Sequence, residues 1–303
     1  MLDVSTWDIV ALANTLLLYI SGAFSLGGLS IVLMTSKPLS FRRYLLRYAG
    51  LSAAVLSVSA VMSFVVQVGA YADNGLRGLW DPDFTAILWD SPIGQQALTR
   101  SLSSLFFLLT TGLLWRETTV PSLTSLPVRF RDLTLTGALL LYGYSFHQTG
   151  HTVDLPDIAV LLIMVHVIAI SWWLGSLYPL WRSCHMLEQT SLHDLMTRFG
   201  QLAAWAVGLL MLSGGYLLFL LLASAAELIQ TNYGNMLLTK LIFVTGLLSL
   251  AALNKWRLTP LLANGQGHLA LARSIKMELA LGLFIFLTTT ILTTWLSPAN
   301  MAA

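Results

Sequence analysis

The sequence has few charged residues and a single cysteine. Only 10% of its 303 residues are charged, whereas soluble domains carry about 25%. A chain with 56% apolar residues and a mean hydropathy of +0.75 therefore requires lipid as part of its solvent. Because Cys184 is the only cysteine, an intrachain disulfide and a cluster of thiolate ligands are both excluded.

Several functional motifs are also missing. The net charge of +2 is too small to indicate a nucleic-acid partner. The sequence has no G-x-x-x-x-G-K-[ST] loop for nucleotide phosphates, and no H-E-x-x-H or plausible G-x-S-x-G motif. We therefore expect a protein that is not an enzyme and binds neither nucleic acid nor nucleotide. Any transport it performs would take its energy from a gradient, a membrane potential or a partner.

Long apolar runs recur along the whole chain. Each can cross about 30 Å of hydrocarbon as a helix of roughly 20 residues, and none shows the alternation of a β-barrel strand. Acidic residues precede the first run, so we expect it to stay as a span and not to be cleaved as a signal peptide. The predicted fold class is all-α: a polytopic transmembrane helical bundle, one integral membrane domain over residues 1–303. The eight predicted spans cover residues 8–34, 46–72, 93–115, 132–150, 156–181, 199–224, 234–256 and 272–296.

Basic residues gather in alternate gaps between these spans and at the span ends that border those gaps. Thirteen of the sixteen lie after the first, third, fifth and seventh spans: Lys37, Arg42, Arg43, Arg47, Arg116, Arg129, Arg131, Arg182, Arg198, Lys255, Arg257, Arg273 and Lys276. The gaps on the other side hold Arg77 as their one basic residue, beside Asp73, Asp81, Asp83, Asp90, Asp154, Asp157 and Glu227. Because basic loops stay in the cytoplasm, this asymmetry predicts that both termini are periplasmic.

Polar side chains inside the spans are costly to place in lipid, so each is a functional hypothesis. His166 follows Pro156 by ten residues and should lie about 15 Å deep, near the midplane. Glu278 lies near the inner end of the last span. The other members fall in the outer third of their spans: Asn14, Gln67, Arg100, His147, His151 and Lys240.

Three histidines form a candidate metal site. His147 and His151 are four residues apart and share one helix face if the helix persists through Gly150. His166 on the next span would add a third imidazole, and Met164 a thioether. Neutral nitrogen and soft sulfur ligands suit copper or another late transition metal, and imidazoles suit haem iron as well. The metal candidates are therefore His151, His166 and His147.

Simpler roles are open for the same residues. His147 could be a water-facing interfacial residue, and His166 could be hydrogen-bonded to a neighbouring helix. Arg100 and Lys240 could extend their charged ends to the outer interface. The remaining histidines, His185, His193 and His268, lie in inner loops beside basic residues, which is typical of solvated surface.

Short blocks of residues follow one another in order through the second half of the chain. They are Gly150-His151-Thr152, His166 with Ser171 to Leu177, Arg198-Phe199-Gly200, Ser213-Gly214, Gly234 to Lys240, Ala252-Leu253-Asn254, and Glu278 with Gly282. In this order they resemble the copper resistance D (CopD) family of bacterial inner-membrane proteins. The resemblance is best over residues 140–298, and it extends to the first half mainly through the topology.

The resemblance implies copper handling, usually copper import from the periplasm, beside a separate CopC-like periplasmic copper-binding protein. It implies His151 and His166 as metal-associated positions, and Lys240 and Glu278 as matched polar positions without an assigned role. The sequence departs from the family at Asn14, where some members carry histidine. The expected partners are thus a copper ion of unassigned oxidation state, the lipid bilayer of the inner membrane and a CopC-like chain.

Two other functions are compatible with the sequence. One is a b-type haem or quinol-linked membrane redox protein that uses His147, His151 and His166 as haem ligands. The other is a non-transporting membrane scaffold that docks a periplasmic copper chaperone through the acidic loop between Asp73 and Asp90. An absorption spectrum distinguishes the first, and a flux assay distinguishes the second.

Overall fold

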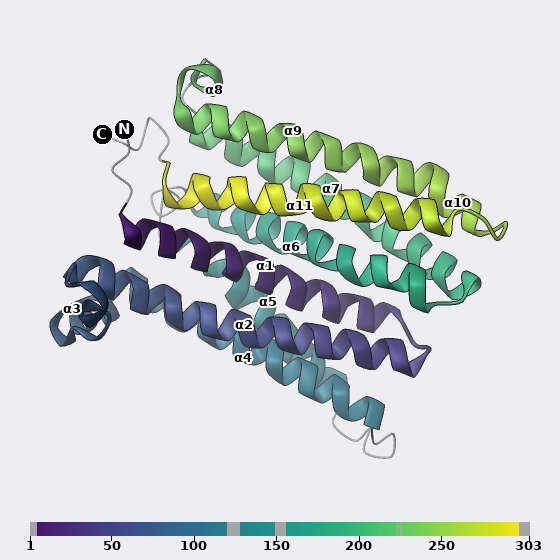
Figure 1. Cartoon of the computed structure of the whole chain (residues 1–303), viewed down its shortest axis with the longest axis horizontal. Helices are drawn as coiled ribbons and strands as arrows, with labels where there is room; N and C mark the ends of the chain where they lie inside the picture. The colour runs from purple at the N-terminus through teal and green to yellow at the C-terminus, as the bar shows by residue number, and fades with distance from the viewer. Residues whose placement is uncertain (1–4, 120–127, 149–155, 223, 225, 297–303) are drawn as a thin grey trace.

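The computed structural model describes residues 5–119, 128–148, 156–222, 224 and 226–296. Within these ranges every regular element is helical (Figure 1), which confirms the all-α fold class. The elements are α1 (Thr6–Met34), α2 (Leu39–Ala72), the 3-10 helix η1 (Gly75–Trp80), α3 (Pro82–Trp89), α4 (Pro92–Thr119), α5 (Val128–Tyr144), α6 (Asp157–Met186), α7 (Gln189–Leu221), α8 (Glu227–Gln230), α9 (Asn232–Leu253), the π-helical segment η3 (Asn254–Leu258), α10 (Thr259–Leu262) and α11 (His268–Thr294).

Seven helices in the described ranges are long and apolar enough to cross a membrane: α1, α2, α4, α6, α7, α9 continued to Leu262, and α11. The fourth predicted span, residues 132–150, corresponds to α5, which has 17 residues and ends at Tyr144. At 1.5 Å per residue it is about 26 Å long, slightly shorter than the hydrocarbon layer. In the part of the chain that the structure describes, seven helices are thus long enough to span the membrane, and the shorter α5 packs against α4 and α6.

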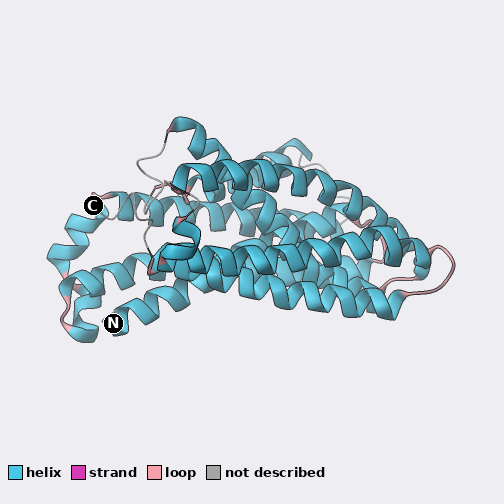
Figure 2. Ribbon diagram, turned by 90° about the horizontal axis from the view of Figure 1, so that it is seen from above, coloured by secondary structure: helices cyan, strands magenta, loops and turns pink. Residues whose placement is uncertain are grey.

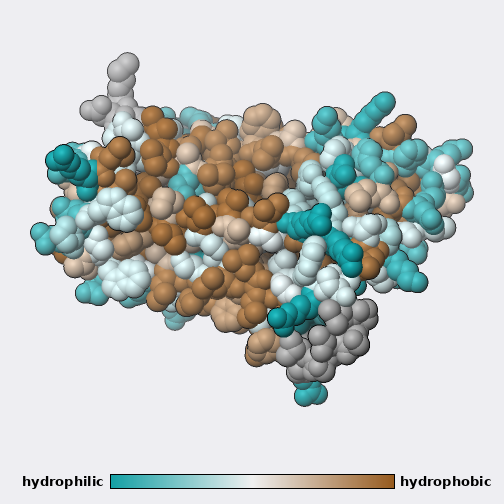
Figure 3. All heavy atoms as spheres, turned by 60° about the horizontal axis from the view of Figure 1, so that its bottom comes forward, coloured by the Kyte–Doolittle hydropathy of each residue, from teal (hydrophilic) through white to brown (hydrophobic). Residues whose placement is uncertain are grey.

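The helices run side by side along the long axis of the molecule (Figures 1 and 2). The start of α1 lies beside the end of α11, where Nε1 of Trp295 donates to the carbonyl oxygen of Asp8 at 3.4 Å. This end also carries η1, α3 and α8, and we call it the acidic end, after its residues Asp8, Asp73, Asp81, Asp83, Asp90, Asp157 and Glu227. The opposite end carries the thirteen basic residues and is called the basic end. In Figure 3 apolar side chains cover the middle of the visible face, with polar ones toward both ends.

Helix α1 is the centre of the bundle, packed against α2, α6 and α11. Its most apolar stretch is 67% buried within the protein, whereas those of α7 and α9 are each only 11% buried. The apolar side chains of α7 and α9 therefore need lipid to cover them. The polar residues buried in the bundle are mostly serines and threonines, many of which donate to a carbonyl one turn earlier in their own helix.

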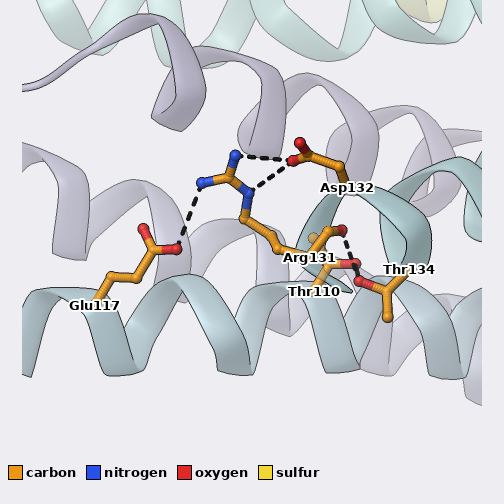
Figure 4. A network of polar contacts seen from close by, with 5 residues as sticks. All are labelled: Thr110, Glu117, Arg131, Asp132 and Thr134. Atoms are coloured by element: carbon orange, nitrogen blue, oxygen red, sulfur yellow. Dashed lines mark hydrogen bonds and ion pairs between the residues drawn. The ribbon is translucent and has the colours of Figure 1, made fainter. Parts of the chain in front are cut away.

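The short helix α5 is held to α4 by polar contacts along its length. Gln96 donates to the carbonyl oxygen of Ser145 at 2.8 Å, and Ser103 donates to that of Ala138 at 2.8 Å. Figure 4 shows the contacts at the basic end, where Thr110 donates to Thr134 and Arg131 contacts Glu117 and Asp132. Buried hydrogen bonds of this kind between membrane helices contribute about 0.6 kcal/mol each.

The charge asymmetry between the two ends gives a testable topology. We expect alkaline phosphatase, which is active in the periplasm, to be active when fused after Gly78 at the acidic end. Green fluorescent protein, which is fluorescent in the cytoplasm, should be fluorescent when fused after Pro121, which follows α4 in the sequence. Each reporter should be inactive at the other position. Two fusions reporting the same side would contradict the arrangement of the first three spans.

Candidate functional site

The imidazole of His166, in the first third of α6, is held by a serine of α7. Its Nδ1 lies 3.2 Å from the hydroxyl oxygen of Ser213, a residue that is only 1% exposed. The Ser213 hydroxyl donates its own proton to the carbonyl oxygen of Leu209 at 2.6 Å. Its oxygen is then the acceptor, so Nδ1 of His166 carries the proton and Nε2 presents a lone pair.

This arrangement matches what metal-binding histidines usually require. A ligating imidazole donates its other N–H to a fixed acceptor, which sets the tautomer and the ring orientation. Within the described part of the chain, Nε2 of His166 has no hydrogen-bond partner that would occupy its lone pair. This geometry is compatible with His166 as a neutral nitrogen ligand between α6 and α7.

Gly214 gives the ring the space it needs. A methyl group at this position would lie 3.0 Å from Cε1 of His166 and 3.4 Å from its Nδ1. The Ser213-Gly214 pair thus provides both the acceptor and the close approach of α7 to the ring. Lys240 of α9 lies within electrostatic range of His166, so any cation bound at the imidazole would also feel the charge of this amine.

The structure does not bring Met164 to the imidazole. Successive helical residues are rotated by 100°, so Met164 and His166 point about 200° apart around α6. Met164 faces α5, where a methyl group placed on Gly143 would lie 3.2 Å from its Cβ. The expectation that this thioether joins His166 as a ligand is therefore wrong for this arrangement of α6.

The other two predicted histidines are not assembled with His166 by the described residues. His147 lies in the turn after α5, where its N–H donates to the carbonyl oxygen of Tyr144 at 3.0 Å. Because the helix ends at Tyr144, the condition for His147 and His151 to share one helix face is not met at residues 145–148. His151 itself lies outside the described residues. Within the described ranges no group of three or more His, Cys, Asp or Glu side chains is gathered.

Two further polar residues of the acidic half have clear partners inside the bundle. Asn14 donates from Nδ2 to the carbonyl oxygen of Ser59 at 3.0 Å and so ties α1 to α2. The guanidinium of Arg100 lies over the ring of Phe146, 5.7 Å from its centroid. These contacts give both residues a place in the packing of the first half of the chain.

Sequence reasoning did not predict a second polar site, which lies toward the basic end. Here a cavity of about 380 Å³ is lined by α6, α7, α9, η3 and α11. Glu278, only 3% exposed, borders it and accepts a hydrogen bond of 3.0 Å from Nδ2 of Asn254. Both residues belong to blocks that the sequence had singled out, but nothing in the sequence indicated that they meet.

The hydroxyl of Ser213 provides a direct test of the imidazole arrangement. If His166 binds copper, as the family resemblance implies, Ser213→Ala should weaken that binding by about 10- to 100-fold, because the loss of a partner that orients a ligand typically costs this much. The backbone of Leu209 should stay in place, because the substitution removes only the hydroxyl that donates to its carbonyl oxygen. Copper titration of the purified variant measures the effect. Ser30→Ala, which removes a hydroxyl bonded to Ser176 elsewhere in the bundle, is the matched control, and equal affinities in both variants would contradict the assignment.

Comparison with known proteins gives two matches. Residues 193–292 match the sequence model of the family described as copper resistance protein D. The chain is also similar to the copper transport protein CutJ of Bacillus subtilis (strain 168), with 24% identity over 265 residues. That alignment covers 83% of this chain and 46% of the relative, so the chain spans about half the length of the curated relative it matches. No solved structure matches the chain significantly.

These matches confirm the resemblance that the sequence blocks indicated. The matched region begins in α7 and ends in α11, and therefore contains Ser213, Lys240, Asn254 and Glu278. With the seven candidate spans, they identify a multi-pass inner-membrane protein. His166 lies in the helix immediately before the matched region.

Proposed function

We propose that this chain, whose residues 193–292 match the model of the copper resistance protein D family, moves copper ions across the inner membrane, from the periplasm to the cytoplasm. The observation that carries the proposal is His166, whose Nε2 lone pair is kept free in the middle of the bundle by Ser213. An ion that crosses about 30 Å of hydrocarbon needs such a binding site, because an unligated charge is costly there.

The imidazole of His166 suits copper and other late transition metals. A neutral imidazole binds copper in both oxidation states, whereas Mg²⁺ and Ca²⁺ prefer oxygen ligands. The name of the similar Bacillus subtilis protein points to the same metal. His151, which the family resemblance associates with metal, would act as a second ligand at this site or as a ligand that copper reaches earlier on the same route.

The acidic end would receive the ion. Six aspartates and Glu227 are carried there by the beginnings of α1 and α6, by η1, α3 and α8, and by the residues beside them. Several of these side chains are exposed, including Asp73 and Asp90. A separate CopC-like copper-binding protein would dock at this surface and release copper toward His166.

Copper flux into liposomes containing the purified protein tests the proposal. We expect copper uptake that exceeds uptake in empty liposomes and is much faster than that of zinc or nickel. His166→Ala should reduce the flux to the background while leaving the protein folded. An absorption spectrum of the same sample should lack a Soret band, which distinguishes copper transport from a b-type cytochrome. If the folded protein moves no copper, the scaffold function becomes the better explanation.

A further inference from the structure

Glu278 is an acidic residue buried without a charged partner. It is 3% exposed, on the face of α11 that borders the cavity of the basic end. Its one hydrogen bond comes from the neutral amide of Asn254, at 3.0 Å. Among the described residues, no Lys, Arg or His nitrogen lies within 4.0 Å of the carboxylate. A carboxylate kept permanently charged in such a place would be costly.

The amide of Asn254 can satisfy Glu278 in both of its protonation states. Its Oδ1 is buried and has no hydrogen-bond partner within the described residues. In the observed arrangement Nδ2 donates to the carboxylate. If the amide rotates by half a turn, Oδ1 can instead accept the O–H of the protonated acid, because a carboxyl group gains a donor when it is protonated. The pair can therefore hold or release one proton without leaving Glu278 unbonded.

The elements packed against α11 carry further charged and titratable groups, Arg257 of η3 among them, and Lys276 lies two residues before Glu278 on α11 itself. Of the helices packed against α11, η3 contributes Lys255, which lines the same cavity. Helix α6 contributes Tyr178, which lines a smaller cavity between α1, α6 and α11 and is hydrogen-bonded to Tyr44. The thiol of Cys184 in α6 donates to the carbonyl of Leu180. Helix α1 has no titratable residue in its last two turns, and α9 has none between Lys240 and η3.

The backbone at Asn254 departs from a regular α-helix. Asn254 begins the π-helical segment η3, which interrupts the regular hydrogen bonding of α9 just before it continues into α10. Segments of this kind are frequent at functional sites. The widened turn places Asn254 against α11, and η3 contacts this helix directly.

The site of Glu278 lies on the same set of helices as His166. On α7, 13 residues separate Ser213 beside His166 from Gly200 at the cavity. On α9, 14 residues separate Lys240 from Asn254. At 1.5 Å per residue, both helices give a separation of about 20 Å along the bundle axis. His166 and Glu278 are thus successive polar positions of the compartment formed by α6, α7, α9 and α11.

We propose that Glu278 and Asn254 form a proton-binding site that exchanges its proton for the transported cation. The O–H bond of the Glu278 acid breaks when a copper ion reaches the cavity from the acidic end, and the proton passes to water on the side of the acidic end. The carboxylate then balances the charge of the ion, and it takes a proton from water at the basic end once the ion leaves there, so that one proton moves opposite to the copper ion. No electron is transferred. The proposal rests on the proposed function for the identity of the cation.

The donor chemistry favours a proton over a metal as the resident ligand of this pair. A carboxylate and one amide oxygen are hard donors, and they offer too few ligands for Mg²⁺ or Ca²⁺, which take six or more. Copper in its reduced form prefers nitrogen and sulfur. The pair therefore stabilises a passing copper ion by its charge and binds the proton tightly.

The first experiment contains no metal and tests Glu278 by itself. Infrared spectra of the purified full-length chain are recorded over the pH range in which it stays folded, for the parent, Glu278→Gln and Glu188→Gln. We expect the parent minus Glu278→Gln difference to show a buried carboxylic acid converting reversibly to a carboxylate. Glu188, which is exposed at the basic end, should give only the signal of a water-exposed acid. If Glu278 stays in one form throughout, the proposal is overturned.

The second experiment tests the coupling. In weakly buffered liposomes with a trapped pH indicator, copper uptake by the parent should be accompanied by opposite proton movement. Glu278→Gln should lose this proton movement and keep copper binding, because glutamine preserves the hydrogen bond to Asn254. If the Glu278–Asn254 hydrogen bond is only structural, copper uptake by Glu278→Gln should be accompanied by the same proton movement as in the parent, and that result overturns the coupling. Copper uptake by the parent without proton movement overturns it as well. A parent that moves no copper refutes the proposed function instead, and the infrared result then decides on the proton site alone.

Discussion

Replacing His166 with alanine is expected to abolish high-affinity copper binding. The substitution removes the imidazole that Ser213 holds between α6 and α7, the proposed metal ligand inside the bundle. A lost ligand should cost more than the roughly 10- to 100-fold that follows from loss of an orienting partner. We therefore expect the dissociation constant to rise by more than about 100-fold, and copper titration of purified protein measures it.

The same titration contains its own controls. His185 and His268 are exposed at the basic end, so His185→Ala and His268→Ala should bind copper as the parent does. His151→Ala should resemble His166→Ala if the family resemblance assigns that residue correctly. His147→Ala should have a weak effect, because its turn is on the α5 side of the bundle, whereas His166 faces α7. Parent-like binding by a folded His166→Ala variant would place the site elsewhere.

Most of the fold was predictable because apolar length is a strong signal. The span predicted at residues 156–181 is α6 (Asp157–Met186), and the span predicted at 272–296 is α11 (His268–Thr294). The spans predicted at residues 46–72 and 199–224 start later than the helices α2 (Leu39–Ala72) and α7 (Gln189–Leu221) do. Arg42 and Arg198 in fact lie inside α2 and α7, because these helices continue beyond the apolar layer.

The end of α5 was not predictable from composition. Residues 145–150 continue a pattern that could be helical, yet the helix stops at Tyr144. The carbonyl oxygen of Ser145 accepts a hydrogen bond from Gln96 of α4, so a neighbouring helix provides the partner that the next helical turn would supply. A contact between residues 49 positions apart leaves no trace in the local sequence.

The candidate site was predictable only in part, because contacts between residues far apart in the sequence leave no trace in the local sequence. His166 was found because a histidine near the midplane of a span is unusual. Its partner Ser213 was visible only as part of a short family block, and the direction of Met164 depended on how α5 and α7 pack around α6. The meeting of Asn254 and Glu278 across the basic-end cavity required the three-dimensional arrangement.

The closest helix crossing of the bundle has the second large expected effect. A methyl group placed on Gly175 of α6 would overlap the carbonyl group of Ala23 in α1, and one placed on Gly27 would overlap the backbone of Gly175 and Ser176. Without side chains at Gly27 and Gly175, the two backbones touch directly. Small residues allow such approaches in membranes, where van der Waals packing drives helix association. Because α1 is the central helix, this crossing joins the two halves of the protein.

Gly175→Ala should therefore destabilise the protein strongly, although alanine favours a helix by about 1 kcal/mol over glycine. Overpacking typically costs about 1–3 kcal/mol, and more where the obstacle is backbone, as here. Gly208→Ala on α7 is the matched control: a methyl group there meets nothing within 4 Å, so only the gain in helix propensity remains. Thermal unfolding in detergent, followed by size-exclusion chromatography, measures both. We expect a loss of folded Gly175→Ala at temperatures where Gly208→Ala and the parent remain intact, and equal stability of the two variants would show that α1 and α6 can separate at little cost.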